Sequence, residues 1–158
     1  MVMACDKIGI DFHGVINTNP RFFKDLLAAM LEQDIEVHII SGGPRDFLEK
    51  YLQQHQIPYS VLWCIFDFYE AKEQVIFNDD GTFCVDDELW NTAKAEYCAQ
   101  NDISLHIDDS SVYERSFSTP YCRYDSKRRE CTIAGKVISF SGNPREVLAE
   151  IIHCGGFF

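Results

Sequence analysis

The chain has 158 residues, of which 46% are hydrophobic, and a formal net charge of −11 at pH 7. This length suits one hydrophobic core, so we expect a single domain over residues 1–158. The negative charge argues against nucleic acid as a partner, because such binding depends largely on neutralising phosphates. A small phosphorylated ligand held by a few cations stays compatible with it.

The amino terminus lacks a signal-peptide pattern, and no stretch approaches the roughly 20 apolar residues that a membrane helix needs. We therefore expect a cytoplasmic protein with no membrane partner. The seven cysteines include no Cys-x-x-Cys pair. This spacing suggests neither a disulfide framework nor a zinc ribbon, so we expect reduced cysteines that serve mainly in packing.

Apolar runs alternate with helical patterns along the chain, which is typical of a parallel sheet flanked by helices. The predicted strands span residues 7–12, 35–41, 59–66 and 103–108. The predicted helices span residues 20–33, 44–55, 87–100 and 143–153. The expected fold class is α/β, a three-layer Rossmann-like arrangement around a mainly parallel sheet with small β-hairpin additions.

Two stretches fall outside this alternation. Residues 75–85 place apolar arms around Asp79-Asp80-Gly81, which predicts a β-hairpin. Residues 119–140 predict a further strand pair that turns near Ser126-Lys127. The nearby basic run 127–129 is best interpreted as a solvated hairpin tip.

Three predicted helices begin alike, at Asn19-Pro20, Gly43-Pro44 and Asn143-Pro144. A small or amide cap followed by proline at the first helical position is a common helix start. The similarity between residues 42–48 and 142–148 therefore follows from helix-start chemistry and does not indicate an internal duplication.

Chemistry-bearing residues gather where the predicted strands end. Asp11 closes an apolar run that breaks at Gly14, Ser41 ends the second strand before Gly42, and the pair Asp108-Asp109 ends the fourth. The carboxyl ends of parallel strands meet at one edge of an open α/β sheet, which is where such sheets bind ligands. Any one of these side chains alone could equally cap a helix or accept loop amides.

Together these residues resemble the haloacid dehalogenase (HAD) superfamily, whose typical members are magnesium-dependent phosphatases. Residues 11–16, Asp-Phe-His-Gly-Val-Ile, match the first motif, Ser41 the second, Lys94 the third and Asp108-Asp109 the fourth. Four motifs in the family's order are more specific than any one of them. Lys94 is the weakest match, and Lys72 is the other candidate lysine.

The resemblance implies a site for Mg²⁺ and a phosphorylated substrate. Asp11 would attack phosphorus and form an aspartyl-phosphate. Asp11, Asp109 or Asp108, and the backbone carbonyl of His13 would hold the metal, with Asp109 favoured as the direct ligand and Asp108 as a partner that reaches the metal through water or through another ligand. Ser41, Gly42 and Lys94 would bind phosphate.

His13 departs from the family pattern, which usually has a second aspartate two residues after the nucleophile. Imidazole can shuttle protons near neutral pH, so His13 is a candidate catalytic acid. The alternative function is a catalytically impaired HAD-like protein with a binding or regulatory role. A response-regulator receiver ranks lower, because its acidic pair comes early in the chain and its lysine late.

The remaining histidines and tryptophans have plainer interpretations. We expect structural roles for His38, His55, His106 and His153, since no two have metal-ligand spacing. Trp63 and Trp90 are predicted core residues. The intervals 12–40 and 42–93 leave no room for a large lid, so the resemblance implies an open site, closed by a bulky substrate or by a neighbouring subunit of a homo-oligomer.

Overall fold

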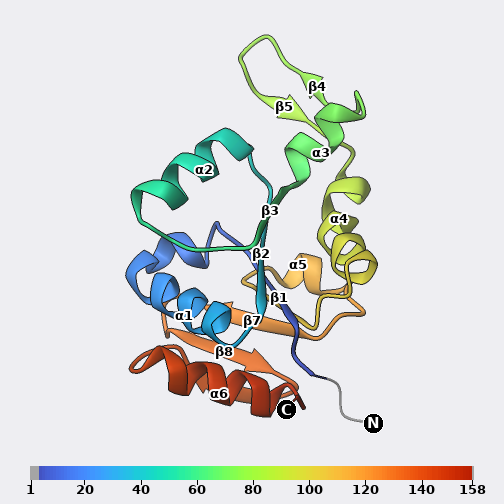
Figure 1. Ribbon diagram of the computed structural model, residues 1–158. Coiled ribbons are helices and arrows are strands. Elements are labelled where there is room, and N and C mark those ends of the chain that lie inside the picture. The colour runs from blue at the N-terminus through green and yellow to red at the C-terminus, as the bar shows by residue number, and fades with distance from the viewer. Residues whose placement is uncertain (1–3, 158) are drawn as a thin grey trace.

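The computed structural model describes residues 4–157, which fold around a seven-stranded sheet (Figure 1). The strands lie in the order β3-β2-β1-β6-β7-β8-β9. Their bounds are β1 (Lys7–Ile10), β2 (Glu36–Ser41), β3 (Val61–Cys64), β6 (Leu105–Asp108), β7 (Tyr121–Asp125), β8 (Glu130–Ile133) and β9 (Lys136–Ser139). Neighbours from β3 to β7 pair in parallel, whereas β8 and β9 continue the sheet antiparallel.

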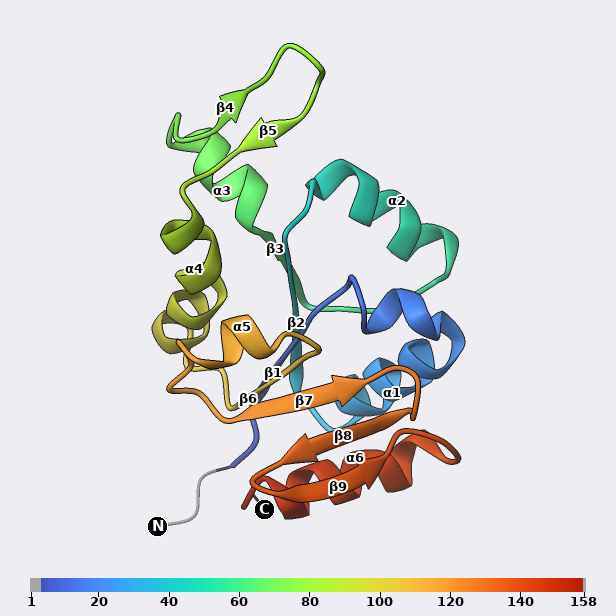
Figure 2. The ribbon, with the colours of Figure 1, turned by 180° about the vertical axis from the view of Figure 1, so that it is seen from behind.

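Helices cover both faces of the sheet. They are α1 (Pro20–Glu32), α2 (Arg45–Gln54), α3 (Ile65–Ala71), α4 (Asp87–Gln100), α5 (Ser111–Glu114) and α6 (Pro144–Cys154), with a short 3₁₀ helix η1 (Ile16–Thr18). Figures 1 and 2 show α1 and α2 on one side of the sheet and α3, α4 and α5 on the other. Helix α6 packs beside α1.

The central strands are apolar because both of their faces are covered. Ile10 of β1 pairs with Ile39 of β2 and with Ile107 of β6, and all three side chains are fully buried. Helix α1 adds a buried face at helical spacing, formed by Phe22, Phe23, Leu26, Leu27 and Met30. This core fixes the register of the three strands whose ends form the site described below.

The four strands and four helices predicted from the alternating pattern are confirmed, with ends that differ from the predicted ones by at most two residues. Residues 119–140 differ from the expected strand pair, because a second turn at Ala134-Gly135 divides them into β7, β8 and β9. Both turn residues have positive φ, which lets the chain reverse tightly there. Helices α3 and α5 were not predicted.

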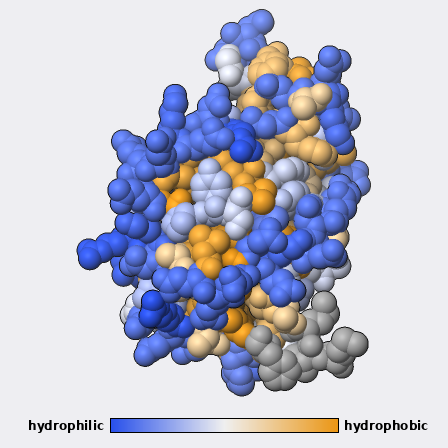
Figure 3. Space-filling view, viewed as in Figure 1, coloured by the Kyte–Doolittle hydropathy of each residue, from blue (hydrophilic) through white to orange (hydrophobic). Residues whose placement is uncertain are grey.

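The hairpin predicted at 75–85 is confirmed as β4 (Ile76–Phe77) and β5 (Phe83–Cys84), which pair with each other and not with the main sheet. Ile76 and Phe77 are 68% and 62% exposed at its arms. Figure 3 shows apolar surface near the end of the molecule where this hairpin projects. No helix in the described part of the chain is long and apolar enough to cross a membrane.

Two of the three predicted helix starts are confirmed. The side chains of Asn19 and Asn143 accept backbone hydrogen bonds at the starts of α1 and α6. The third differs, because α2 begins at Arg45 with Pro44 in the N-cap position. Its first free amide, that of Arg45, donates instead to Asp67 Oδ2 of α3 at 2.9 Å.

The expectation of reduced cysteines is wrong for Cys122 and Cys131, which form a disulfide between β7 and β8. Both side chains are fully buried, and their Cα atoms lie 5.9 Å apart. Strand pairing brings them together across nine residues of sequence, a proximity that no local cysteine motif indicates. Cys5, Cys64, Cys84, Cys98 and Cys154 are free.

Candidate functional site

The order of the strands in the sheet reverses at β1, which makes this strand a topological switch point. The strand that follows in sequence, β2, lies on one side of β1, and β6 lies on the other. Crevices at the carboxyl ends of such strands are the usual ligand sites of open α/β sheets. Asp11 follows β1 at this point, and its backbone amide donates to the Ile107 carbonyl of β6 at 2.9 Å. The end of β1 is thereby tied to the end of β6, where the acidic pair begins.

Lys94 joins the acids from these two strands. Its ammonium nitrogen lies 2.9 Å from Asp11 Oδ1 and 2.9 Å from Asp108 Oδ2, and its side chain is 3% exposed. Burial alone would lower the pKa of this amine, but the two carboxylates outweigh burial and raise its pKa. Lys94 is therefore a permanently charged group at this sheet edge.

Asp108 is held from three directions. Oδ2 accepts from Lys94 and lies 2.9 Å from His106 Nε2, while Oδ1 accepts from the Ser110 amide at 3.2 Å. Burial would raise the pKa of Asp108, but the hydrogen bonds and charges of His106 and Lys94 hold it well below its usual range. Burial lowers the pKa of His106, so its neutral imidazole donates to Asp108.

Asp109 lies beside Asp108 but faces outward. Its carboxylate packs against the backbone of Gly14, where a Cβ would collide with Oδ2 and Oδ1. Gly14 also has φ +82°, in the left-handed region that favours glycine. Burial and the charge of Asp108 raise the pKa of Asp109. Glycine at position 14 is thus needed for the close approach of Asp109.

Asp11 is the buried acid with an uncommitted oxygen. Oδ1 accepts from the Phe12 amide at 2.8 Å and from Lys94, whereas no hydrogen bond within residues 4–157 engages Oδ2. Burial raises the pKa of Asp11 to about 7, because Lys94 compensates only part of the cost of placing this charge near Asp108 and Asp109. Three carboxylates against one ammonium leave this crevice short of positive charge.

A hard cation would supply the positive charge that this crevice lacks. Asp11, Asp108 and Asp109 each offer a carboxylate oxygen, and these oxygens lie within 4.8 Å of one another. Carboxylate and carbonyl oxygens are the preferred ligands of Mg²⁺. Asp109 and Asp11 present accessible oxygens, while Asp108 is already saturated by Lys94, His106 and Ser110.

A cavity of about 320 Å³ opens onto these acids. Its lining residues are Asp11, His13, Gly42, Gly43, Phe83, Trp90, Lys94, Asp109, Ser110 and Tyr113. His13 reaches it as an exposed side chain, and burial followed by the charge of Lys94 lowers its pKa. The structure therefore brings Asp11, His13, Gly42, Lys94 and Asp109 to one cavity, with Asp108 behind them.

Ser41 does not line this cavity. It ends β2 fully buried, and its hydroxyl oxygen accepts from the Gly43 amide at 3.4 Å. Its position shapes the backbone turn at Gly42 and Gly43, which do reach the cavity. A direct contact between Ser41 and phosphate stays a prediction.

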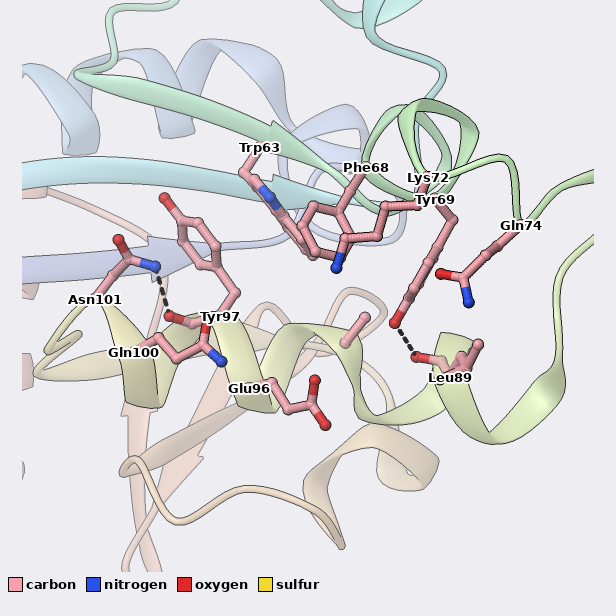
Figure 4. Close-up of a pocket in the computed structure, with 11 residues that line it drawn as sticks. Trp63, Phe68, Tyr69, Lys72, Gln74, Leu89, Glu96, Tyr97, Gln100 and Asn101 are labelled. Atoms are coloured by element: carbon pink, nitrogen blue, oxygen red, sulfur yellow. Dashed lines mark hydrogen bonds between the residues drawn. The ribbon is translucent and has the colours of Figure 1, made fainter.

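Lys72, the alternative lysine, lies elsewhere. It lines a second cavity of about 510 Å³ between α3 and α4, where its ammonium sits 4.1 Å from the Phe68 ring centroid (Figure 4). Trp63 and Tyr97 stack at 4.6 Å on the same cavity, and His38 Nδ1 lies 2.8 Å from the Tyr97 hydroxyl. The geometry therefore distinguishes the two lysines, since only Lys94 contacts the acids.

Several residues of the site were interpreted from sequence only as packing residues. His106 contacts Asp108, two positions further along the same strand and so on the same face, a spacing that sequence could have revealed. Trp90 precedes Lys94 by one helical turn on α4, and both line the cavity. Phe83 and Tyr113 arrive from the hairpin and from α5, and no local pattern indicates their place.

Comparison with known proteins adds no family. No protein-family model matches the chain, and no curated protein matches it significantly. The fold and the site geometry are therefore the basis for assigning a function.

Proposed function

We propose that this protein is a Mg²⁺-dependent phosphomonoesterase with a three-layer HAD-like fold, acting through an aspartyl-phosphate. The observation that carries the proposal is the convergence of Asp11, Lys94, Asp108 and Asp109 at the switch point of a parallel sheet. Phosphate monoesters resist attack because both they and their nucleophiles are anionic, so such a site needs a nucleophile beside fixed positive charge.

Asp11 is the nucleophile in this proposal. A carboxylate oxygen of Asp11 attacks phosphorus, and the bond from phosphorus to the ester oxygen breaks, with the electron pair leaving on that oxygen. The departing alkoxide takes a proton from protonated His13 or from water, and the water that attacks in the next step returns a proton to His13. Water then attacks the aspartyl-phosphate at phosphorus, which releases inorganic phosphate and restores the Asp11 carboxylate.

The surrounding residues hold the charges in place. Asp11, Asp109 and the backbone carbonyl of His13 would bind Mg²⁺, which supplies neutralisation of charge on the phosphoryl oxygens when bound. Lys94 adds a fixed positive charge, and Asp108 with His106 keeps its ammonium at hydrogen-bond distance from Asp11. The Gly42 and Gly43 backbone lies at the same cavity, where it is available to phosphate.

A second candidate function is a binding or regulatory protein that keeps the metal and phosphate site without turnover. The observation that favours it is His13, an imidazole at the cavity where the HAD pattern has a carboxylate. A His13→Asp variant separates the two functions. Turnover that appears only in this variant would support the regulatory protein, while turnover by the wild type supports the enzyme.

The direct test measures phosphate release from a broad panel of phosphomonoesters with Mg²⁺, for the wild type and for Asp11→Asn. We expect release by the wild type and none by the variant, because the amide is a poor nucleophile. Beryllium fluoride, which stands in for a phosphoryl group, should bind the wild type alone. Equal turnover by Asp11→Asn would contradict the role of Asp11.

A further inference from the structure

Three aromatic side chains line the candidate cavity beside the acids. Phe83 comes from β5, Trp90 from α4 and Tyr113 from α5. The rings of Phe83 and Trp90 lie 5.9 Å apart between centroids, and the Tyr113 ring centroid is 4.9 Å from Lys94 Nζ. We call these three residues the aromatic wall. Tyr113 lies beside Lys94, the ammonium expected to bind phosphate, and Trp90 and Phe83 continue the wall from Tyr113.

The aromatic wall is fixed before any ligand binds. Trp90 Nε1 donates to the Tyr113 hydroxyl at 3.0 Å, and the Trp90 ring lies so close to Gly42 that a Cβ there would be 2.9 Å from it. The Phe66 ring supports Phe83 at 4.6 Å. Because the indole N–H is already engaged, the wall offers mainly flat apolar surface, and the Tyr113 hydroxyl is its polar group with a hydrogen left to donate.

This surface disfavours a polyol as the ester group. The rings can contact the apolar face of a sugar but satisfy few of its hydroxyl groups, so a sugar brought against them loses more hydrogen bonds to water than the wall replaces, which costs free energy. A flat aromatic ring loses little on the same transfer and gains contact with the wall. The chemistry of the wall therefore separates two large classes of phosphate ester.

The charges at the cavity limit the number of phosphates. Lys94 is the one lysine or arginine among the described residues that line it, and three carboxylates lie close to that lysine. A second phosphate would meet no further lysine or arginine there and would be repelled by the acids that the metal leaves uncompensated. With a volume of about 320 Å³, the cavity suits a small molecule.

We propose that the substrate is a small phosphate monoester whose alcohol carries one flat aromatic ring, and that Phe83, Trp90 and Tyr113 hold this ring. This inference rests on the hydrolase activity proposed above. It assigns specificity to the aromatic wall and the chemical step to the acids and Lys94.

The test compares benzyl phosphate with cyclohexylmethyl phosphate in the presence of Mg²⁺. Both release a primary alcohol, so a difference between them reports on the flat ring and not on the leaving group. We expect kcat/KM to be about tenfold higher for the benzyl ester. Phe83→Ala should reduce that ratio to about twofold, whereas Ile76→Ala, a truncation on the same hairpin at an exposed residue outside the cavity, should leave it unchanged.

A binding measurement separates this inference from the proposed hydrolysis. The chain has two tryptophans, so Trp63→Phe leaves Trp90 as the sole indole, and its fluorescence reports on benzylphosphonate and cyclohexylmethylphosphonate, which lack a scissile ester. Calorimetry on the wild type gives the same affinities if Trp63→Phe weakens the fold. Tighter binding of the benzyl compound without turnover of either ester would overturn the hydrolase and support the aromatic wall. Equal affinities and equal kcat/KM values, unchanged by Phe83→Ala, would overturn the inference.

Discussion

Asp11→Asn should stabilise the protein at pH 8 in the absence of metal. Asp11 shares a buried crevice with Asp108 and Asp109, and Lys94 is the ammonium that contacts it there. Burial raises the pKa of Asp11 from 3.8 to about 7. Since each pKa unit corresponds to about 1.4 kcal/mol, ionising Asp11 at pH 8 lowers the free energy of unfolding by an amount on the order of 4 kcal/mol.

Asparagine avoids this cost but turns an amide group toward Lys94 or toward solvent. Part of the gain is lost with the ion pair, so we expect a net stabilisation of about 1–3 kcal/mol. For a chain of this length, this corresponds to a rise in Tm of about 3–10 °C. The protein would then gain stability from a change that removes its proposed nucleophile.

The pH dependence follows from the sign of the shift. Because the folded-state pKa of Asp11 lies above its unfolded value, the folded protein binds the extra proton between about pH 4 and pH 7. Asp11 therefore contributes most stability below pH 4, and this contribution is lost as the pH rises through about 7. In Asp11→Asn that component of the slope should be absent.

The assay is urea unfolding of the wild type and Asp11→Asn from pH 5 to pH 8.5 with a chelator, repeated with Mg²⁺. Asp79→Asn makes the same chemical change at an exposed position of the hairpin turn and should match the wild type throughout. Saturating Mg²⁺ should stabilise the wild type, by about 2.7 kcal/mol at one hundred times Kd. A metal-free Asp11→Asn protein less stable than the wild type at pH 8, with the same pH slope, would refute this reasoning.

Three further predictions use matched pairs. Asp108→Asn should lower the free energy of unfolding by about 3–5 kcal/mol because it leaves Lys94 and His106 without their buried charged partner. Asp109→Asn should change the free energy of unfolding in urea only slightly and instead abolish the stabilisation by Mg²⁺. Equal losses of stability in both variants would contradict the division between a buried and an outward acid. Gly14→Ala should destabilise by about 1–3 kcal/mol more than Gly81→Ala, because both glycines have positive φ but only Gly14 faces a carboxylate; chemical denaturation measures the difference, and similar losses would show that the contact is unimportant. His13→Ala should reduce hydrolysis of an alkyl phosphate far more than that of an activated aryl phosphate, with rescue by His13→Asp; equal rates for wild type and alanine on both esters would limit His13 to its backbone carbonyl.

Local patterns were sufficient to predict most of the elements. The first residues of α1 and α6 are predictable from Asn19 and Asn143, whose side chains cap the helix that starts next to them. The predicted start of α2 is one residue early, and the contact that satisfies its first amide, from Arg45 to Asp67 of α3, could not be found this way because α3 comes later in the chain. Helix α3 itself lies within the interval that the sequence assigned to the end of a strand and the approach to a hairpin.

Some residues of the candidate site were likewise predictable from local sequence, and others were not. Asp11, Ser41 and the acidic pair were predictable because each ends a strand, and parallel strands bring their ends together. The burial of the Ser41 hydroxyl, the pairing of Cys122 with Cys131 and the aromatic wall depend on packing between distant segments. Such contacts are set by the whole fold, so no short stretch of sequence encodes them.

The hairpin β4-β5 belongs to a sheet of its own and joins the body of the molecule through α3 and α4 (Figure 1). Residues 76–84 could therefore change in length or sequence without altering the register of β1, β2 and β6. Phe83 lies on strand β5 of this hairpin, whereas Asp11 follows β1 and Lys94 lies on α4. A change in the hairpin can thus replace one ring of the aromatic wall and leave the reacting groups untouched, while Trp90 and Tyr113 stay on α4 and α5 beside those groups.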